Sequence, residues 1–320
     1  MIRRFPLALA LAGCAEKADV PARAAVTRQP VIDMHRHAAW LDEDDDARLA
    51  TTLAEMDANA VVLAVIGIPQ PEDVATYIVP HSDRFIGGVE TGCPRVTAGG
   101  RWQCFEDGSG LADLTWLRRE IGAGRIVAIH EIVNIYAGLA AGDPKLEPYW
   151  ALAEELDVPT GIHIGRGPPA DSPFRPTGCC PEFDSDMGNP ALLRPVLDKH
   201  PKLRLWLEHV GAGDGIPGIP PYTDETMALL RDYPNVYLDM SITSFVMTPE
   251  VFEKHVRLLI DAGFGERIMF GSDNLPIAPQ LARIAAIEWL TPEHRRAILY
   301  DNAARFLRLS PERIAADYRR

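Results

Sequence analysis

The sequence predicts an α/β protein folded as a single (β/α)₈ TIM barrel with C-terminal helices. Short apolar runs alternate with amphipathic segments about eight times between residue 31 and the C-terminal region, as such a barrel requires. The chain has 320 residues, 47% of them hydrophobic, which is enough for one large core. A doubly wound open sheet is the alternative. Such sheets usually have fewer strands, and no Gly-x-Gly-x-x-Gly loop follows the first strand here.

The predicted strands are rich in β-branched and apolar residues. The run at 60–66 is almost continuously apolar, as expected for a parallel strand covered on both faces. In the helix at 45–59, Leu49, Leu53 and Met56 recur on one side. The predicted strands are 31–34, 60–66, 85–90, 125–131, 158–163, 203–209, 236–240 and 267–273. The predicted helices are 45–59, 72–79, 111–121, 147–156, 190–199, 223–231, 249–262 and the segments from 279 onward.

Charge and hydropathy narrow the function classes. The formal net charge is −13 with a pI of about 5.2, and no Lys/Arg-rich run occurs, so nucleic-acid binding is not expected. No run of ~18 apolar residues is present, so the sequence predicts no ordinary transmembrane helix. A small-molecule substrate is the expected partner, and the sequence leaves the oligomeric state open.

The first residues predict export. Residues 1–13 combine a basic start, a short apolar core and a small-residue site, as in a lipoprotein-type signal peptide. Leu11-Ala12-Gly13-Cys14 resembles the bacterial lipobox, which implies lipidation of Cys14 and a membrane-anchored protein facing the periplasm or exterior. Residues 14–29 read as an Ala-rich tether before the barrel at 30–320. The alternative is a cytoplasmic protein with a frayed N-terminus.

Cysteine usage is compatible with an oxidising compartment. Cys93 and Cys104 flank a Gly-rich loop, and no Cys-x-x-Cys zinc pattern occurs. A disulfide between Cys93 and Cys104 is one option, which depends on their geometry.

The first predicted strand leads into an unusual polar run. Asp33, His35 and His37 alternate along it, so a regular strand places all three side chains on one face. Burying such groups without partners costs several kcal/mol. A divalent metal would satisfy the imidazoles.

More such residues end other predicted strands. Five polar residues lie at C-terminal strand ends, where barrel enzymes build their active sites: His35 and His37, His163, His209 and Asp273. Each histidine alone is equally well explained by a bond to a loop carbonyl, but together they predict one site. His35, His37, His163 and Asp273 offer imidazole and carboxylate ligands that suit Zn²⁺.

The expected chemistry is hydrolytic. A bound ion lowers the pKa of its water toward ~7, giving metal-bound hydroxide near neutral pH. Asp273 is expected to act as general base, either bound weakly or bound while it accepts a proton. His209 is expected to face the open position and to polarise a substrate carbonyl or protonate a leaving group.

Several motifs together resemble those of one superfamily. They are His35-Arg36-His37, Gly161-Ile162-His163-Ile164-Gly165, Leu207-Glu208-His209-Val210-Gly211, Phe270-Gly271-Ser272-Asp273 and Asn302-Ala303-Ala304-Arg305-Phe306-Leu307. These resemble the amidohydrolase superfamily, in its amidohydrolase-related branch, which contains enzymes like aminocarboxymuconate-semialdehyde decarboxylase. The resemblance implies a metal-dependent barrel in which His35, His37, His163 and Asp273 bind metal and His209 is catalytic. It does not fix the reaction.

The fourth strand leaves the number of ions open. Binuclear members carry a carboxylated Lys or a Glu there, and this strand offers His130 and Glu131. On a regular strand these two point to opposite faces, so at most one faces the interior. Glu131 is expected either to bind or bridge a second metal, or to bond a ligand imidazole. We expect one ion, with a second through Glu131 left open.

Two residues are predicted to bind substrate. Arg166 follows His163 and can clamp a carboxylate bidentately, and Trp40 follows the first strand as an apolar wall. The function predicted first is a metal-dependent hydrolase of a small ester, lactone or amide. The alternative is a metal-dependent decarboxylase of a small unsaturated or aromatic acid. A third possibility, a lipid-anchored binding protein without catalysis, is disfavoured by the complete ligand set.

Overall fold

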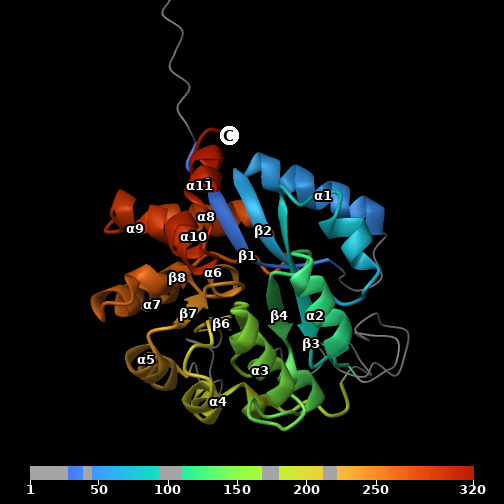
Figure 1. Cartoon of the computed structure of the whole chain (residues 1–320). Helices are drawn as coiled ribbons and strands as arrows, with labels where there is room; N and C mark the ends of the chain where they lie inside the picture. The colour runs from blue at the N-terminus through green and yellow to red at the C-terminus, as the bar shows by residue number, and fades with distance from the viewer. Residues whose placement is uncertain (1–27, 39–44, 94–109, 168–179, 212–221) are drawn as a thin grey trace, which may run out of the picture.

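A computed structural model of the chain describes residues 28–38, 45–93, 110–167, 180–211 and 222–320. Eight parallel strands follow one another in the order β1 to β8, and helices surround them (Figure 1). This is the predicted (β/α)₈ barrel with C-terminal helices. The strands are β1 Val31–His37, β2 Val61–Ile68, β3 Phe85–Thr91, β4 Ala128–Ile132, β5 Thr160–His163, β6 Leu205–Glu208, β7 Val236–Asp239 and β8 Ile268–Met269.

The barrel is closed by a short seam between its first and last strands. β8 has only two residues, fewer than the predicted strand at 267–273. Beyond it, the Met34 N–H donates to the Phe270 carbonyl at 2.9 Å, and the Asp273 N–H donates to the His35 carbonyl at 2.8 Å. Residues 270–273 therefore continue along β1 as an irregular edge, and we call this contact the seam.

The helices between the strands follow the predicted order with shifted ends. The predicted helix at 72–79 is one π-helical turn, Val74–Ile78. The α-helices are α1 Asp45–Ala58, α2 Leu114–Gly122, α3 Glu147–Leu156, α4 Arg194–Lys199, α5 Thr223–Asp232, α6 Thr243–Val246, α7 Pro249–Asp261, α8 Ile277–Ala285, α9 Pro292–Arg296, α10 Asn302–Phe306 and α11 Pro311–Asp317.

Three C-terminal helices start with the same local signal. α7, α9 and α11 each begin with Pro at the first helical position, preceded by Thr248, Thr291 or Ser310. Each hydroxyl accepts a hydrogen bond from a backbone N–H of the first turn. Pro lacks the N–H that the helix leaves unpaired, and the hydroxyl satisfies another, so this pair fixes the start of a helix.

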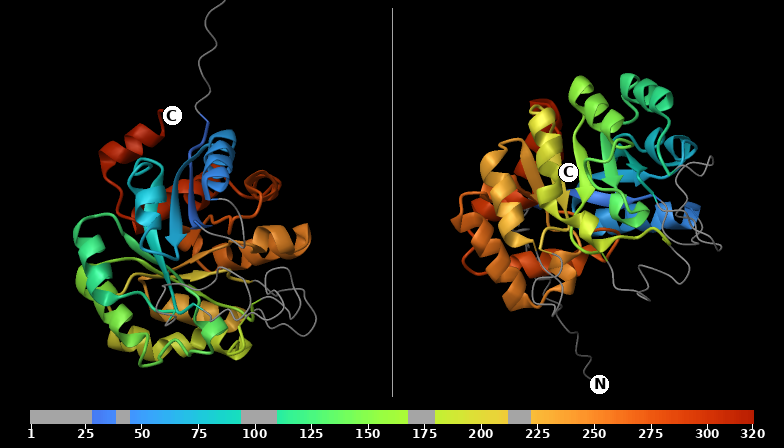
Figure 2. Two further views of the ribbon diagram at one scale, coloured as in Figure 1. Left: turned by 90° about the vertical axis from the view of Figure 1, so that its right-hand side faces the viewer. Right: turned by 90° about the horizontal axis from the view of Figure 1, so that it is seen from below.

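The C-terminal segment covers the N-terminal end of the barrel. The Phe306 ring lies 5.5 Å from the Trp206 ring and 4.7 Å from the Tyr237 ring, and both partners lie near the start of their strands. Tyr300 belongs to the same apolar cluster as Ile32 of β1. Figure 2 shows the last helices beside the first strand, so both ends of the barrel sequence meet here. The opposite end, where the strands finish, is left for the site.

The predicted N-terminal segments fall largely outside the described residues. The leader at 1–13 and most of the tether at 14–29, including Cys14, therefore stay predictions, and Cys104 is also outside. Cys93 and Cys180 are each disulfide-bonded. Among the described helices, none combines the length and apolarity needed to cross a bilayer.

Asn302 links the C-terminal segment to the seam side of the barrel. Its buried side chain donates to the carbonyls of Gly265 at 2.8 Å and Ile268 at 2.7 Å. Asn302→Ala leaves both carbonyls without this donor, so we expect the free energy of unfolding to fall by about 2–3 kcal/mol. Denaturant unfolding measures the change. The matched control, Asn235→Ala, removes an exposed bond to the Pro201 carbonyl and should change the same quantity by less than ~0.5 kcal/mol. Equal effects of the two variants would contradict the assignment.

Candidate metal centre

The predicted polar residues converge at the C-terminal end of the barrel. All are buried, none with more than 8% of its surface exposed. They come from β1, β4, β5 and the residues just after β6 and β8. They are His35, His37, Glu131, His163, His209 and Asp273.

The first two histidines face each other through their outer nitrogens. Nε2 of His35 lies 3.2 Å from Nε2 of His37. Nδ1 of His35 is 3.1 Å from Oδ2 of Asp239, and Nδ1 of His37 is 2.7 Å from Oε1 of Glu90. Ionised carboxylates only accept hydrogen bonds, so both Nδ1 atoms carry the protons in the neutral rings. The two Nε2 lone pairs then point at one another, an arrangement that requires a cation or an added proton between them.

A carboxylate completes this first group. Oδ1 of Asp273 lies 3.2 Å from Nε2 of His37 and 3.7 Å from Nε2 of His35. The ligand atoms of these three residues all lie within 4.8 Å of one another. Atoms that share a tetrahedral Zn²⁺ at ~2.1 Å are about 3.4 Å apart. The donor set and its spacing therefore fit a divalent metal ion.

Glu131 lies between two pairs of imidazoles. Its Oε1 is 2.7 Å from Nδ1 of His163 and 3.1 Å from Nε2 of His209. Its Oε2 is 3.8 Å from Nε2 of His35 and 3.9 Å from Nε2 of His37. One carboxylate thus faces a different histidine pair with each oxygen.

His130 and Glu131 both lie inside the barrel, so the expectation that at most one would do so is wrong. The His130 ring is 4.6 Å from the His35 ring, while Glu131 reaches His163 and His209. The registers of β4 with β3 and with β5 both shift between Ile129 and Ile132. An irregularity of this kind interrupts the alternation of side chains.

His130 is one half of a buried pair below the cluster. Its Nδ1 lies 2.7 Å from Oε1 of Glu208, and its ring stacks on Trp206 with centroids 5.4 Å apart. Burial lowers the pKa of His130 well below its usual value and raises the pKa of Glu208 well above its own. These directions favour the neutral form of both groups beneath the candidate metal centre.

Two glycines make room for this arrangement. A Cβ at Gly161 would overlap the Glu208 carboxylate and the Trp206 ring. A Cβ at Gly271 would lie 2.8 Å from Cβ of His35 and 3.1 Å from Cβ of Ser241. Only glycine lets these strands approach the polar interior so closely.

Asp33 does not join the histidines. Its carboxylate accepts hydrogen bonds from the backbone N–H and the hydroxyl of Ser272 at 2.8 and 2.6 Å. It also accepts from Arg36 at 3.4 Å. The pairing of β1 with β2 shifts between Asp33 and Arg36, which separates Asp33 from the face that holds His35 and His37. Asp33 instead ties β1 to the seam.

Three supporting residues were not singled out from the sequence. Glu90, Asp239 and Ser241 bond the ring nitrogens of the clustered histidines. The available signal was position: Glu90 ends the predicted third strand and Asp239 lies in the predicted seventh, at the same end of the barrel as the histidines.

The structure does not test either of the two predicted substrate-binding residues. Arg166 donates to Asp186 at 2.9 Å, and its side chain is 37% exposed. Trp40 lies outside the described residues. The role of Arg166 as a carboxylate clamp remains a prediction.

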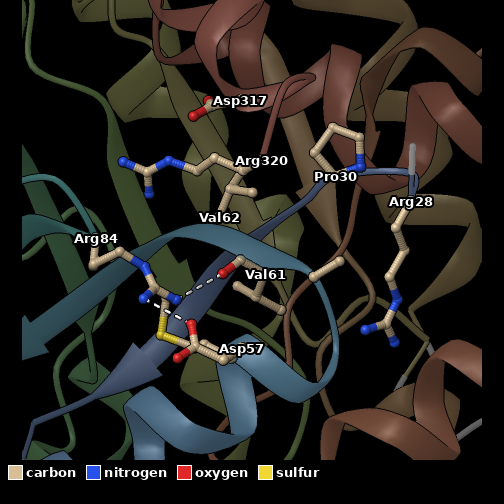
Figure 3. Close-up of a pocket in the computed structure, with 10 residues that line it drawn as sticks. Arg28, Pro30, Asp57, Val61, Val62, Arg84, Asp317 and Arg320 are labelled. Carbon is tan, nitrogen blue, oxygen red and sulfur yellow. Dashed lines mark hydrogen bonds and ion pairs between the residues drawn. The ribbon is translucent and has the colours of Figure 1, made fainter. Parts of the chain in front are cut away.

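A hollow at the other end of the barrel is distinct from this centre. It encloses about 310 Å³ between the starts of β1 and β2 and the C-terminal helix, beside Arg28, Arg84 and Arg320 (Figure 3). Arg84 pairs with Asp57 at 2.8 Å and donates to the Val61 carbonyl at 3.2 Å. No described histidine lines it, and it lies at the end of the barrel away from the clustered histidines.

In the chain without a bound ion, protons on His37 and His209 supply the positive charge among the carboxylates. Burial opposes protonation of His37, but the charge of Glu90 and the hydrogen bond to Asp273 prevail and raise its pKa to about 10. Burial likewise opposes protonation of His209, but its bond to Glu131 and the nearby carboxylates raise its pKa to about 9. Burial also opposes ionisation of Asp273, yet the His37 bond and histidine charges hold the pKa of that carboxyl below its usual value.

These shifts predict how the stability of chelator-stripped protein depends on pH. The folded chain binds the His37 and His209 protons more tightly than the unfolded chain, whose histidines titrate near 6.5. The added stability is complete below pH ~6.5 and is lost as the pH rises through ~9–10. We expect the free energy of unfolding to fall between pH 6.5 and 9.5, by about 1 kcal/mol per pH unit for each group until that group's own pKa is reached. The thermal unfolding midpoint should fall with it over the same range.

The control is His37→Asn, which removes one of these two protons. Its midpoint should fall less steeply over the same pH range. A wild-type midpoint that stays constant or rises between pH 6.5 and 9.5 would show that the cluster does not hold these protons.

Comparisons with known proteins agree with the fold. A probable 2-pyrone-4,6-dicarboxylic acid hydrolase from Acinetobacter baumannii superposes with a TM-score of 0.60 at 15% identity, covering 87% of this chain and 99% of that one. The 2,6-dihydroxybenzoate decarboxylase from Rhizobium gives 0.57 at 17%, covering 88% and 99%. A 5-carboxyvanillate decarboxylase mutant from Novosphingobium aromaticivorans, with bound manganese and a nitrobenzoic acid, gives 0.59 at 15%, covering 89% and 98%.

Sequence comparison gives the family. No curated protein sequence matches the chain significantly. The family model described as Amidohydrolase matches residues 32–309, a span that includes all eight strands except the first residue of β1, and every predicted metal ligand. The chain belongs to the amidohydrolase family.

Proposed function

We propose that this protein is a metal-dependent hydrolase of a small ester, lactone or amide, with a centre for two divalent ions that Glu131 bridges. The observation that carries the proposal is the placement of Glu131. Its Oε2 faces the Nε2 atoms of His35 and His37 at 3.8 and 3.9 Å, and its Oε1 faces Nε2 of His209 at 3.1 Å and Nδ1 of His163 at 2.7 Å. The 2.7 Å contact is a hydrogen bond from His163 in the ion-free chain, and Nδ1 of His163 would give up that proton on binding an ion. A bridging carboxylate needs two such separate ligand groups.

The proposed first subsite consists of His35, His37 and Asp273, and the second of His163 and His209, with Glu131 shared. The sequence alone predicts one ion, with a second through Glu131 left open, and a catalytic His209. The contact between His209 and Glu131 supports a ligand role for His209 instead. Imidazole and carboxylate donors suit Zn²⁺, and the manganese in one structural neighbour makes Mn²⁺ the second candidate.

The chain's own residues supply the proton chemistry. A divalent ion bound here makes a water acidic enough to ionise near neutral pH and polarises a carbonyl oxygen. Asp273 stays ionised, because its pKa is held below the usual value. Its carboxylate, at the edge of the first subsite, accepts the proton of the attacking water and returns it to the leaving group.

Decarboxylation is the second candidate. Two of the structural neighbours above are decarboxylases of aromatic acids, whereas another is a probable hydrolase. At 15–17% sequence identity to this chain, these structures support an argument about the fold alone. A decarboxylase would use the same ligands, and Arg166 would hold the substrate carboxylate.

Metal content tests the two-ion centre. We expect about two equivalents of metal in wild-type protein by mass spectrometry. Glu131→Ala and His163→Ala should each retain about one equivalent, because both leave the His35, His37 and Asp273 group intact. The matched control Glu155→Ala alters an exposed carboxylate that pairs with Arg118 and should keep both. If wild-type protein binds only one equivalent and Glu131→Ala still binds it, the centre holds a single ion and the bridged pair is excluded.

Products separate the two reactions. We expect wild-type protein to release acid from a panel of esters, lactones and amides, and Asp273→Asn to slow that release by at least ~10²-fold through loss of the general base. Asp232→Asn, an exposed residue paired with Arg194, is the control and should be unaffected. Release of CO₂ from hydroxybenzoates, without acid release from the panel, would favour the decarboxylase.

A further inference from the structure

The end of β7 connects histidines from both proposed subsites. Asp239, fully buried, uses Oδ2 to accept from Nδ1 of His35 at 3.1 Å. Its Oδ1 accepts from the backbone N–H of His209 at 3.1 Å. The same Oδ1 accepts from the backbone N–H and hydroxyl of Ser241 at 3.0 and 2.6 Å. One carboxylate thus contacts one histidine from each subsite.

The Ser241 hydroxyl fixes the tautomer of His209. A hydroxyl has one proton, and the 2.6 Å contact to Asp239 uses it, because an ionised carboxylate cannot donate. Oγ of Ser241 must then accept from Nδ1 of His209 at 2.9 Å. His209 therefore carries its proton on Nδ1 and presents the lone pair of Nε2 to the Glu131 side. Nδ1 of His35 also lies 3.2 Å from this hydroxyl.

Asp239 also holds the backbone that carries His209. His209 has a φ of +60°, a left-handed conformation that is strained for a residue other than glycine. The bond from its N–H to Asp239 stabilises that turn. The turn follows β6 directly, so it determines where the imidazole lies relative to Glu131.

We propose that Asp239 and Ser241 are positioning residues that orient His35 and His209 together, so that the two metal subsites are assembled through one shared support. This inference rests on the proposed two-ion centre. Glu90 provides the contrast, since the histidine of the described cluster that it bonds is His37, of the first subsite. Loss of a partner that orients a metal-binding histidine typically weakens metal affinity by 10–100-fold.

The substitutions make distinct demands. In Asp239→Asn the amide oxygen is needed by the three donors at the Oδ1 position, so the amide nitrogen faces Nδ1 of His35. Two donors then meet, and His35 must move its proton to Nε2, where it blocks metal binding. His209 keeps its support in this variant only if the amide oxygen retains its place. Ser241→Ala removes the acceptor of His209 at 2.9 Å and the longer contact with His35 at 3.2 Å, while His35 keeps its bond to Asp239.

The test is metal titration of chelator-stripped protein with Zn²⁺ and with Co²⁺, whose visible absorption reports each ligand set. We expect Asp239→Ala, which removes both acceptor oxygens, to weaken binding of both equivalents by at least ~10-fold, and Asp239→Asn to weaken chiefly the first-subsite equivalent. Ser241→Ala should weaken chiefly the second-subsite equivalent, and Glu90→Gln chiefly the first. Ser241→Thr, which retains the hydroxyl, should restore the second-subsite spectrum. Circular dichroism of each stripped variant checks that the barrel is folded.

The outcomes distinguish this inference from the proposed function. Wild-type protein that binds fewer than two equivalents overturns the two-ion centre and the shared support with it. Wild-type protein that binds two, together with a folded Asp239→Ala that binds both with unchanged affinity and spectrum, leaves the centre standing and overturns the shared support. Weakening of a single equivalent in Asp239→Ala would likewise show that the support serves one subsite only.

Discussion

The structure is organised around the contact between Nε2 of His35 and Nε2 of His37, 3.2 Å apart. Each ring has its other nitrogen against a carboxylate, Asp239 or Glu90, so neither can turn its proton inward without losing a buried hydrogen bond. Two lone pairs at this distance repel unless positive charge lies between them. The surrounding carboxylates of Glu131 and Asp273 supply the opposite charge that makes such a cation stable there.

The barrel satisfies this constraint by arranging its interior in levels. At the N-terminal end, Phe306 and Trp206 form an apolar plug. Above the plug lies the neutral pair of His130 and Glu208, followed by the charged cluster. The order has a physical reason. Burial stabilises apolar groups and costs little free energy for a hydrogen-bonded neutral pair. Like-charged carboxylates can be buried only where a cation and nearby solvent compensate their charge.

Much of this could be predicted from the sequence. The alternation of apolar runs and helices identified the barrel, and the histidines at strand ends identified the site. What was missed has a common cause. Glu90 and Asp239 are single acidic residues on strands, and a sequence does not show which histidine nitrogen a carboxylate will meet. The inward placement of both His130 and Glu131 depends on an irregular register, which strict alternation cannot anticipate. Similarly, Asp33 has the same spacing in the sequence as His35 and His37, yet its carboxylate accepts hydrogen bonds from Ser272.

The seam gives the proposed metal ligands a second, structural role. His35 and His37 stand on one side of it and Asp273 on the other, and the Asp273 N–H is itself one of the backbone bonds that join the two sides. An ion held by these three residues would therefore connect the first strand of the barrel to its last, across about 240 residues of chain. Loading of the centre and circular closure of the barrel would then be thermodynamically linked, since a ligand that binds only the closed form stabilises it. Metal supply would in that case govern the lifetime of the folded chain in addition to its chemistry.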